Sequence, residues 1–158
     1  MLGYTFYQGE KCAEVTKSGP YGGANGVAFN DLSSSNNGPI TSILLRHGGV
    51  IDAIQLTYGN KLGGHHGGKG GSLKKFNLAT GENIIKVQIS YDKGNNKYVR
   101  RLYFETNKGR KFGPHGNKGS ETRTVTAPRD GCSLSYISGK AGRYVNSLSF
   151  IWCCPGES

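Results

Sequence analysis

Three polar side chains occupy the same place in three similar stretches of the sequence, and each is of a type that can bind a ligand. Residues 48–56, 96–104 and 142–150 each run from a small or polar loop through an apolar pair and one polar residue into an alternating strand. The polar residue is Asp52, then Arg100, then Asn146. The copies start 48 residues apart (48 to 96) and then 46 residues apart (96 to 142), which indicates an internal repeat. These three junctions are the first candidates for a binding site.

The three polar residues differ in how they can bind a hydroxyl-rich ligand. The carboxylate of Asp52 can accept from two adjacent hydroxyls, and its charge strengthens each bond to roughly 1.5–3 kcal/mol, against about 1 kcal/mol for a neutral pair. Asn146 has one acceptor oxygen and an NH₂ donor, whereas Arg100 has donors only. This chemistry favours sugar binding at Asp52 and Asn146. The alternative is that both side chains cap or bond their own loops, as Asx residues commonly do.

Glycine-rich loops that begin at Pro20, His65 and Pro114 precede the three junctions. Glycine lets a backbone N–H approach a sugar ring where a Cβ would collide, which makes Gly26 and Gly71 candidates for backbone contacts. Tyr144 could offer an aromatic surface to the apolar face of a sugar, or could be a rim residue without a partner. The adjacent pair His65 and His66 lacks a third ligand nearby, so no metal and no cofactor is expected.

The elements around these loops are predicted to be strands. No segment shows sustained helical periodicity, and the short β-branched runs between glycine loops are typical of strands. The sequence therefore predicts an all-β protein of three units, each a glycine loop followed by a junction. Such units cannot bury their faces alone, so three small antiparallel sheets should share one core about a pseudo-threefold axis.

The bulk properties favour a secreted binding protein. The 158 residues predict one domain, and the net charge of +10 favours anionic partners. No run approaches the ~20 apolar residues of a membrane helix, and residues 1–20 lack the apolar block of a signal peptide, so we expect no membrane insertion and a leader already removed. Four cysteines, Cys12, Cys132, Cys153 and Cys154, favour an oxidising extracellular setting, with three possible pairings. Four free thiols in a cytosolic protein are the alternative.

An enzyme is the least favoured class. The ten acidic residues are scattered without a paired-carboxylate arrangement. No Cys or Ser has a recognisable His and Asp context for nucleophilic catalysis. The sequence therefore predicts binding without turnover.

Several motifs taken together resemble those of the jacalin-related lectins over roughly residues 13–152. They are Gly19-Pro20-Tyr21-Gly22-Gly23, Phe29, Ile51-Asp52-Ala53-Ile54, Gly67-Gly68-Lys69-Gly70-Gly71, Thr106-Asn107-Lys108, Phe112-Gly113-Pro114-His115-Gly116 and Ser138-Gly139-Lys140-Ala141-Gly142. The resemblance is to the secreted animal type. It implies a β-prism I fold, with three four-stranded antiparallel Greek-key sheets, and metal-independent binding of mannose- or galactose-type glycans.

The resemblance also implies sites at particular residues. The first would use Gly26 with Arg143, Tyr144 and Asn146, although the family has Asp where this chain has Asn146. The second would use Gly49, Val50, Asp52 and Gly71, with the acid retained. The third pairing, of Gly119 with Lys97, Tyr98 and Arg100, carries a cation where an acceptor belongs, so no sugar site of the family type is expected there.

The sequence also predicts domain limits and partners. We expect an N-terminal extension at 1–18, one lectin domain at 19–152, and a tail at 153–158 that holds Cys153 and Cys154. A homo-oligomer, with a dimer favoured, is expected because weak lectin sites gain avidity from multivalency. The alternative function is a basic matrix protein that binds sulfated glycans or a mineral surface, and its candidate patch is Lys97, Arg100, Arg101 and Lys108. A solvated basic face would explain the same charges, and no motif supports nucleic-acid binding.

Overall fold

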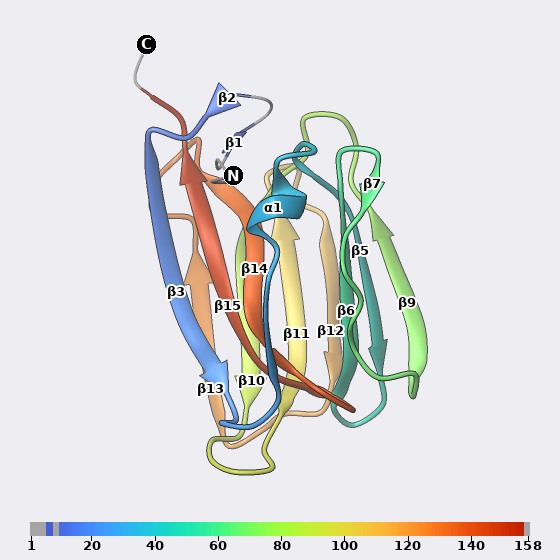
Figure 1. The fold of residues 1–158 in the computed structure, drawn as a ribbon. Helices are drawn as coiled ribbons and strands as arrows, with labels where there is room; N and C mark the ends of the chain where they lie inside the picture. The colour runs from blue at the N-terminus through green and yellow to red at the C-terminus, as the bar shows by residue number, and fades with distance from the viewer. Residues whose placement is uncertain (1–5, 8–9, 157–158) are drawn as a thin grey trace.

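The computed structural model describes residues 6–7 and 10–156, and in it each repeated junction is the turn between two long neighbouring strands (Figure 1). The first turn joins β5 (Ile40–His47) to β6 (Ile51–Tyr58), the second joins β10 (Ile84–Tyr91) to β11 (Val99–Thr106), and the third joins β14 (Ser133–Ala141) to β15 (Val145–Cys154). All three pairs are antiparallel. These six strands are the inner strands of three sheets.

Shorter strands flank each pair. The sheet orders are β3-β15-β14-β4, β7-β6-β5-β9 with β8 also on β6, and β12-β11-β10-β13. The flanking strands are β3 (Glu14–Gly22), β4 (Val27–Asn30), β7 (Lys61–Leu62), β8 (His66–Gly67), β9 (Ser72–Asn77), β12 (Lys111–Gly116) and β13 (Glu121–Thr126). β7 and β8 together take the place that β12 occupies as one strand. The predicted three-sheet, nearly all-β architecture is confirmed.

Two small elements lie outside the three sheets. β1 (Phe6–Tyr7) and β2 (Glu10–Lys11) pair with each other. The helix α1 (Leu32–Ser35) has four residues and was not expected from the sequence. It is one turn long, which is too short to give a helical period in the sequence.

The predicted grouping of each glycine loop with the junction that follows it in the sequence was wrong. Each glycine loop belongs to the sheet of the junction that precedes it in the chain, since β8 pairs with β6, and β12 with β11. The sheet of the third junction is completed by the first glycine loop, because β3 and β4 flank β15 and β14. The first and last strands of the three large sheets, β3 and β15, therefore lie in the same sheet. The order of the units along the sequence does not reveal this pairing.

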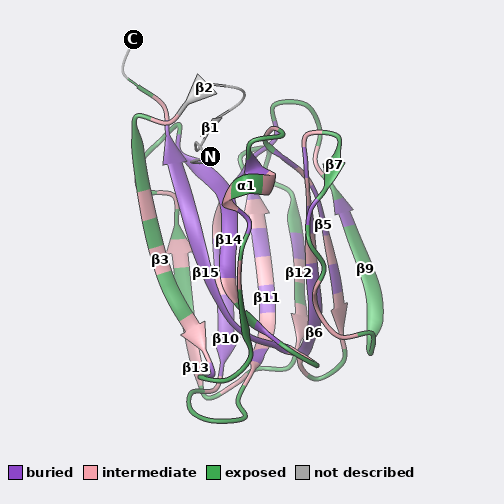
Figure 2. Ribbon diagram, viewed as in Figure 1, coloured by how far each residue is buried: buried purple, intermediate pink, exposed green. Residues whose placement is uncertain are grey.

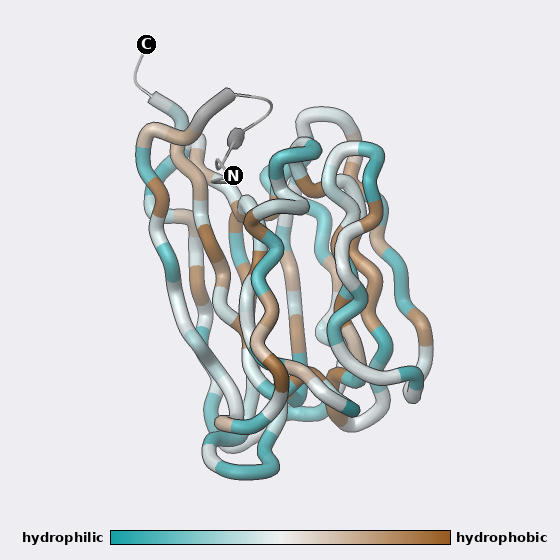
Figure 3. The backbone as a smooth tube through the Cα atoms, viewed as in Figure 1, coloured by the Kyte–Doolittle hydropathy of each residue, from teal (hydrophilic) through white to brown (hydrophobic). Residues whose placement is uncertain are grey.

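The core is formed by the inward faces of the paired strands. The apolar residue two places after each repeated polar residue is fully buried, and these residues are Ile54, Leu102 and Leu148. β15 is buried along its whole length, whereas β3 and β9 are mostly exposed edge strands (Figure 2). Hydrophilic residues gather in the loop between β10 and β11 (Figure 3). The core thus fixes the strands and leaves the turns between them at the surface.

One ring from each glycine loop contacts a neighbouring sheet. The ring centroids of the three pairs lie 5.8 Å, 3.6 Å and 4.9 Å apart, and the pairs are Tyr21 with Tyr91, His66 with Phe29 and His115 with His47. Tyr21, His66 and His115 pair with Leu148, Ile54 and Leu102 of their own sheets. Each sheet thus contacts the next sheet around the prism through one pair of rings.

Two disulfides close the sheet that holds both ends of the chain. They join Cys12 to Cys153 and Cys132 to Cys154. β3 begins at Glu14 and β15 ends at Cys154, so the sheet takes in residues on both sides of the predicted limits 19–152. Residues 1–5, 8–9 and 157–158 of the predicted extension and tail lie outside the described residues.

Candidate functional site

The repeated polar residues come together at one end of the prism, which we call the crown. The crown comprises the loops at residues 22–26, 48–50, 68–71, 92–98, 117–120 and 142–144, at the lower end of Figure 1. The second residue of each strand that follows a junction is the repeated polar residue: Asp52 in β6, Arg100 in β11 and Asn146 in β15. The crown therefore gathers three positions of equal geometry and different chemistry.

Asp52 is held beneath the second glycine loop. Its residue is 6% exposed, and the N–H of Gly68 donates to its backbone carbonyl at 2.9 Å. A Cβ placed on Gly71 would lie 2.6 Å from Oδ1, and one on Gly70 would lie 2.8 Å from Oδ2. Oδ1 is buried and accepts no hydrogen bond from a described residue. An unpaired buried acceptor costs about 1–3 kcal/mol, so this carboxylate favours a hydroxyl donor.

Asn146 has a similar place beneath the first glycine loop but a different set of bonds. Its residue is 5% exposed, and its backbone carbonyl accepts from the N–H of Gly23 at 2.8 Å. Its Nδ2 donates to the carbonyl of Lys97 at 3.3 Å. A Cβ placed on Gly26 would lie 2.6 Å from Oδ1. The amide group thus uses its donor within the crown and directs its acceptor oxygen toward Gly26.

An aromatic and cationic edge borders Asn146. The rings of Tyr144 and Tyr98 lie 4.9 Å apart in an edge-on arrangement, and the Arg143 guanidinium lies 5.7 Å from the Tyr144 ring. Tyr144 and Tyr98 are half-buried, whereas Arg143 is exposed. Tyr98 comes from the second junction, so two junctions contribute to the surface beside Asn146.

The third position is closed by an ion pair. Arg100 Nη1 lies 3.3 Å from Oδ2 of Asp92. The N–H of Ser120 donates to Oδ1 of Asp92 at 2.8 Å, and this bond, together with the Ser120 hydroxyl and Arg100, lowers the pKa of Asp92. The charged groups of Arg100 and Asp92 therefore bind each other, and the N–H of Gly119 already donates to Oγ of Ser90 at 2.7 Å.

The loops of the crown hold one another in a cycle that the sequence did not reveal. The N–H of Ala24 donates to the carbonyl of Gly94 at 3.0 Å, and the N–H of Asn117 donates to the carbonyl of Gly49 at 3.1 Å. A Cβ on Gly68 would lie 2.2 Å from the carbonyl of Arg143, so the second glycine loop touches the third junction. The Lys97 carbonyl and Asn117 thus adjoin the two acceptor positions. The internal repeat could have predicted the roles of Lys97 and Asn117, because each occupies a position that recurs in all three units.

Of the four basic residues predicted to form one patch, Lys108 lies at the opposite end of β11 from the other three. Lys97 precedes β11 and Lys108 follows it, so the eight-residue strand separates them by about 26 Å. Arg100 is paired with Asp92, and Arg101 Nε donates to the carbonyl of Gly116 at 3.0 Å. A polyanion would meet these residues as separate charges rather than as one surface.

A second buried polar cluster supports the sheets away from the crown acceptors. Tyr58 donates to Oδ2 of Asp31 at 2.6 Å, and His66 Nε2 lies 2.7 Å from Oδ1 of the same carboxylate. Burial and the Asp31 carboxylate raise the pKa of Tyr58. All of these polar groups are satisfied by one another, so the cluster is a structural tie between two sheets.

Two kinds of feature, a cluster of metal ligands and a membrane-spanning helix, are absent from the described part of the chain. In residues 6–7 and 10–156, no three His, Cys, Asp or Glu side chains are grouped as metal ligands. Nor does any helix in these ranges have the length and apolar character needed to cross a bilayer.

The sequence was compared with those of known proteins. Residues 18–151 match the family model described as the jacalin-like lectin domain. Zymogen granule membrane protein 16 of Mus musculus is 32% identical over 136 residues, which cover 85% of this chain and 78% of that protein. Griffithsin of Griffithsia sp. is 34% identical over 133 residues, which cover 84% of this chain and 93% of that protein.

Solved structures resemble the whole prism. Artocarpin complexed with Me-alpha-mannose matches with a TM-score of 0.76 at 20% identity, covering 89% of this chain and 99% of that one. Wild-type Malaysian banana lectin matches with a TM-score of 0.75 at 24% identity, covering 90% and 100% of the two chains. These likenesses confirm the predicted β-prism I fold.

Proposed function

The chain belongs to the jacalin-like lectin family, and from this membership we propose that it binds the hydroxyl groups of glycans at the crown without a metal ion. The principal acceptor is Asp52, with Gly49, Val50 and Gly71 around it. Asn146, with Gly26, Arg143 and Tyr144, is a second and weaker acceptor. Binding is not followed by turnover, so the protein is not an enzyme.

The observation that carries this proposal is the unpaired carboxylate oxygen of Asp52. Oδ1 is buried and lies against Gly71, without a donor among the described residues. A pair of adjacent sugar hydroxyls can donate to both oxygens of one carboxylate. Glycine at 70 and 71 lets the second glycine loop pack directly against both carboxylate oxygens, because a Cβ at either position would collide with them.

Mannose-type glycans are the first ligand to test. Similar structures include artocarpin complexed with Me-alpha-mannose and a mannose-specific jacalin-related lectin from Morus nigra in complex with mannose. Galactose-type glycans are the second class, because galactose differs from mannose in configuration at C2 and C4, and this decides which adjacent hydroxyls can reach a carboxylate together.

Substitution of Asp52 is the direct test. We expect Asp52→Ala to lower the affinity for mannosides by more than tenfold, because a charged hydrogen bond contributes about 1.5–3 kcal/mol. Asn146→Ala should lower the remaining affinity by a smaller factor, because its acceptor is neutral. Isothermal titration with methyl α-mannoside and methyl α-galactoside measures both changes, and Arg100→Met, which adds no acceptor, serves as the control at the third position. Unchanged binding in both Asp52→Ala and Asn146→Ala would contradict the site.

The setting of the protein follows from its disulfides and from its relatives. We propose a secreted protein, because both disulfides of the described chain need an oxidising compartment, and two relatives are named for the zymogen granule. A homo-oligomer, with a dimer favoured, would raise the avidity of weak sites. Sedimentation at several protein concentrations tests the oligomeric state.

A further inference from the structure

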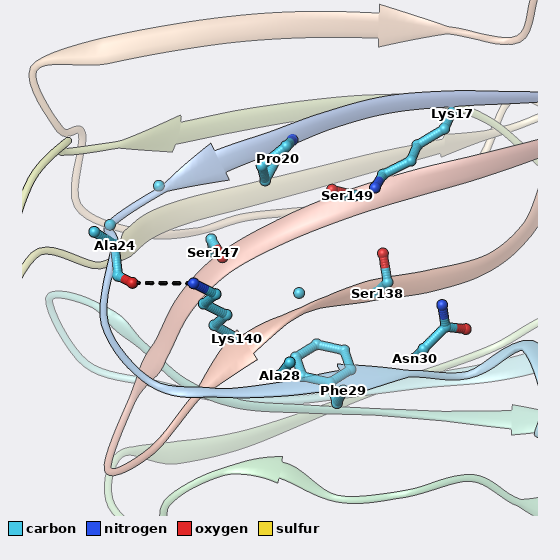
Figure 4. Close-up of a pocket in the computed structure, with 13 residues that line it drawn as sticks. Lys17, Pro20, Ala24, Ala28, Phe29, Asn30, Ser138, Lys140, Ser147 and Ser149 are labelled. Atoms are coloured by element: carbon cyan, nitrogen blue, oxygen red, sulfur yellow. Dashed lines mark hydrogen bonds between the residues drawn. The ribbon is translucent and has the colours of Figure 1, made fainter.

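A groove on the outer face of one sheet carries chemistry that the crown does not use. It runs across β3, β15, β14 and β4 and encloses about 570 Å³ (Figure 4). Six of its lining residues supply the polar side chains: Lys17, Asn30, Ser138, Lys140, Ser147 and Ser149. None of the lining residues is acidic. The groove therefore combines positive charge with a floor of hydroxyl groups.

The floor presents three serines with free hydroxyls. Ser138, Ser147 and Ser149 are 9%, 4% and 2% exposed, and they lie on the two central strands of the sheet. Among the described residues, their hydroxyls make no hydrogen bond with any other group, and they remain accessible from the groove. Each hydroxyl can donate and accept, which suits a ligand that carries hydroxyls of its own.

The two lysines lie at opposite ends of this floor. Lys17 is opposite Ile151 on β15, whereas Lys140 is opposite Ser147, so the two positions differ by about 13 Å along the strands. Lys17 forms no ion pair with any described residue, and its side chain extends toward Ser149 in Figure 4. Lys140 Nζ donates to the carbonyl of Ala24 at 3.2 Å, which leaves two of its three protons for a ligand.

From this arrangement we propose that the groove binds a short acidic saccharide, sulfated or rich in uronic acid. The saccharide hydroxyls bind the serine floor, and its anionic groups bind the ammonium groups of Lys17 and Lys140. A peptide could not be added as a strand here, because the main chains of β14 and β15 are already paired on both sides.

The groove shares Gly22, Gly23 and Ala24 with the crown, but its lining contains neither Asp52 nor Asn146, so substitutions can test the two sites apart. The probe is a sulfated uronate-containing disaccharide, with its desulfated form as the matched ligand. We expect the double variant Lys17→Gln/Lys140→Gln to weaken binding of the sulfated form by about tenfold or more, because two charged contacts are lost. Ser147→Ala/Ser149→Ala should weaken it by a smaller factor without changing the charge.

The matched charge control is Lys61→Gln/Lys75→Gln, which removes two exposed lysines outside the groove. This control should leave binding of the sulfated disaccharide unchanged. The crown variant Asp52→Ala/Asn146→Ala should also leave it unchanged, but should lose mannoside binding if the crown is the lectin site. Amide chemical shifts on titration should change at Lys17, Ser138 and Ser147. Equal weakening by the charge control would show diffuse attraction only, and loss in the crown variant would place the disaccharide at the crown. Equal displacement by an aspartate-rich peptide would overturn the saccharide assignment.

Discussion

At the scale of single residues, the two crown acceptors differ by one group of atoms. Asp52 has two oxygens and no partner for Oδ1, whereas Asn146 has a nitrogen that donates to the Lys97 carbonyl. A carboxylate at position 146 would place an oxygen against that carbonyl, which cannot donate a hydrogen bond to it. The structure thus gives a physical reason for the amide at a position where the sequence motif leads one to expect an acid.

Gly71→Ala tests whether close approach at the crown matters. We expect it to abolish binding at Asp52, because the added Cβ would lie 2.6 Å from Oδ1 and 2.7 Å from the backbone of His47. The control is Gly81→Ala, since the two glycines have φ of +76° and +77° and a Cβ on Gly81 meets nothing within 4 Å. Both variants should lose about 1–2 kcal/mol of stability from the left-handed backbone, and Gly71→Ala should lose more.

Titration with methyl α-mannoside and thermal melting separate these two effects. The Gly81→Ala protein should bind as the wild type does. Retained mannoside affinity in a folded Gly71→Ala protein would count against a ligand beside Asp52.

At the scale of elements, β15 organises the sheet that joins the two ends of the chain. Its adjacent residues Cys153 and Cys154 form disulfides to the segments just before β3 and just before β14. The four cysteines predicted disulfides, but the sequence left three pairings open. The partners depend on which strands flank β15, and that order follows from the closure of the prism rather than from any local pattern.

The two disulfides should differ in their contribution to stability. Their sequence separations are 141 and 22 residues, and closing the longer loop restricts the unfolded chain more. The loop-entropy relation gives roughly 5 kcal/mol for the longer loop and about 3 kcal/mol for the shorter one. We therefore expect Cys12→Ala/Cys153→Ala to lower the free energy of unfolding more than Cys132→Ala/Cys154→Ala. Denaturant unfolding measures both, and equal midpoints would contradict this order.

At the scale of the whole molecule, the sequence predicted the threefold plan but not how the chain is distributed in it. The spacing of Asp52, Arg100 and Asn146 was sufficient to indicate three sheets with a common core. The assignment of each glycine loop to the junction after it was wrong, because pairing partners are set by the sheet and not by the order along the chain. The bonds between sheets, such as that from Asn146 to Lys97, join residues 49 positions apart and leave no local signature.

The contact between His47 and His115 joins two sheets and should make the prism sensitive to acid. Burial, with the charges of His47 and Lys74, lowers the pKa of His115. Below the ordinary histidine pKa of about 6.5, the unfolded chain therefore takes up a proton that the folded chain does not. Stability should fall as the pH decreases from about 6.5 toward the lowered pKa, by at most about 1.4 kcal/mol per pH unit.

His115→Phe tests this expectation, because it keeps a ring beside His47 and removes the titrating group. Its melting temperature should fall less between pH 7.5 and pH 5.5 than that of the wild type. The control is His65→Gln, at an exposed histidine of the second glycine loop. Its melting temperature should fall with decreasing pH as steeply as that of the wild type. Parallel slopes in all three proteins would mean that His115 does not cause the acid sensitivity.

The cycle of contacts that holds the crown loops has a consequence for how one chain meets a branched glycan. The loops are tied to one another, and Arg143 belongs to both acceptor regions, with its side chain beside Tyr144 and its carbonyl against Gly68. Asp52 and Asn146 are thus carried at a fixed spacing on one face of a single chain. A glycan whose two arms match that spacing would bind the second arm at a high effective concentration, so a monomer could be bivalent.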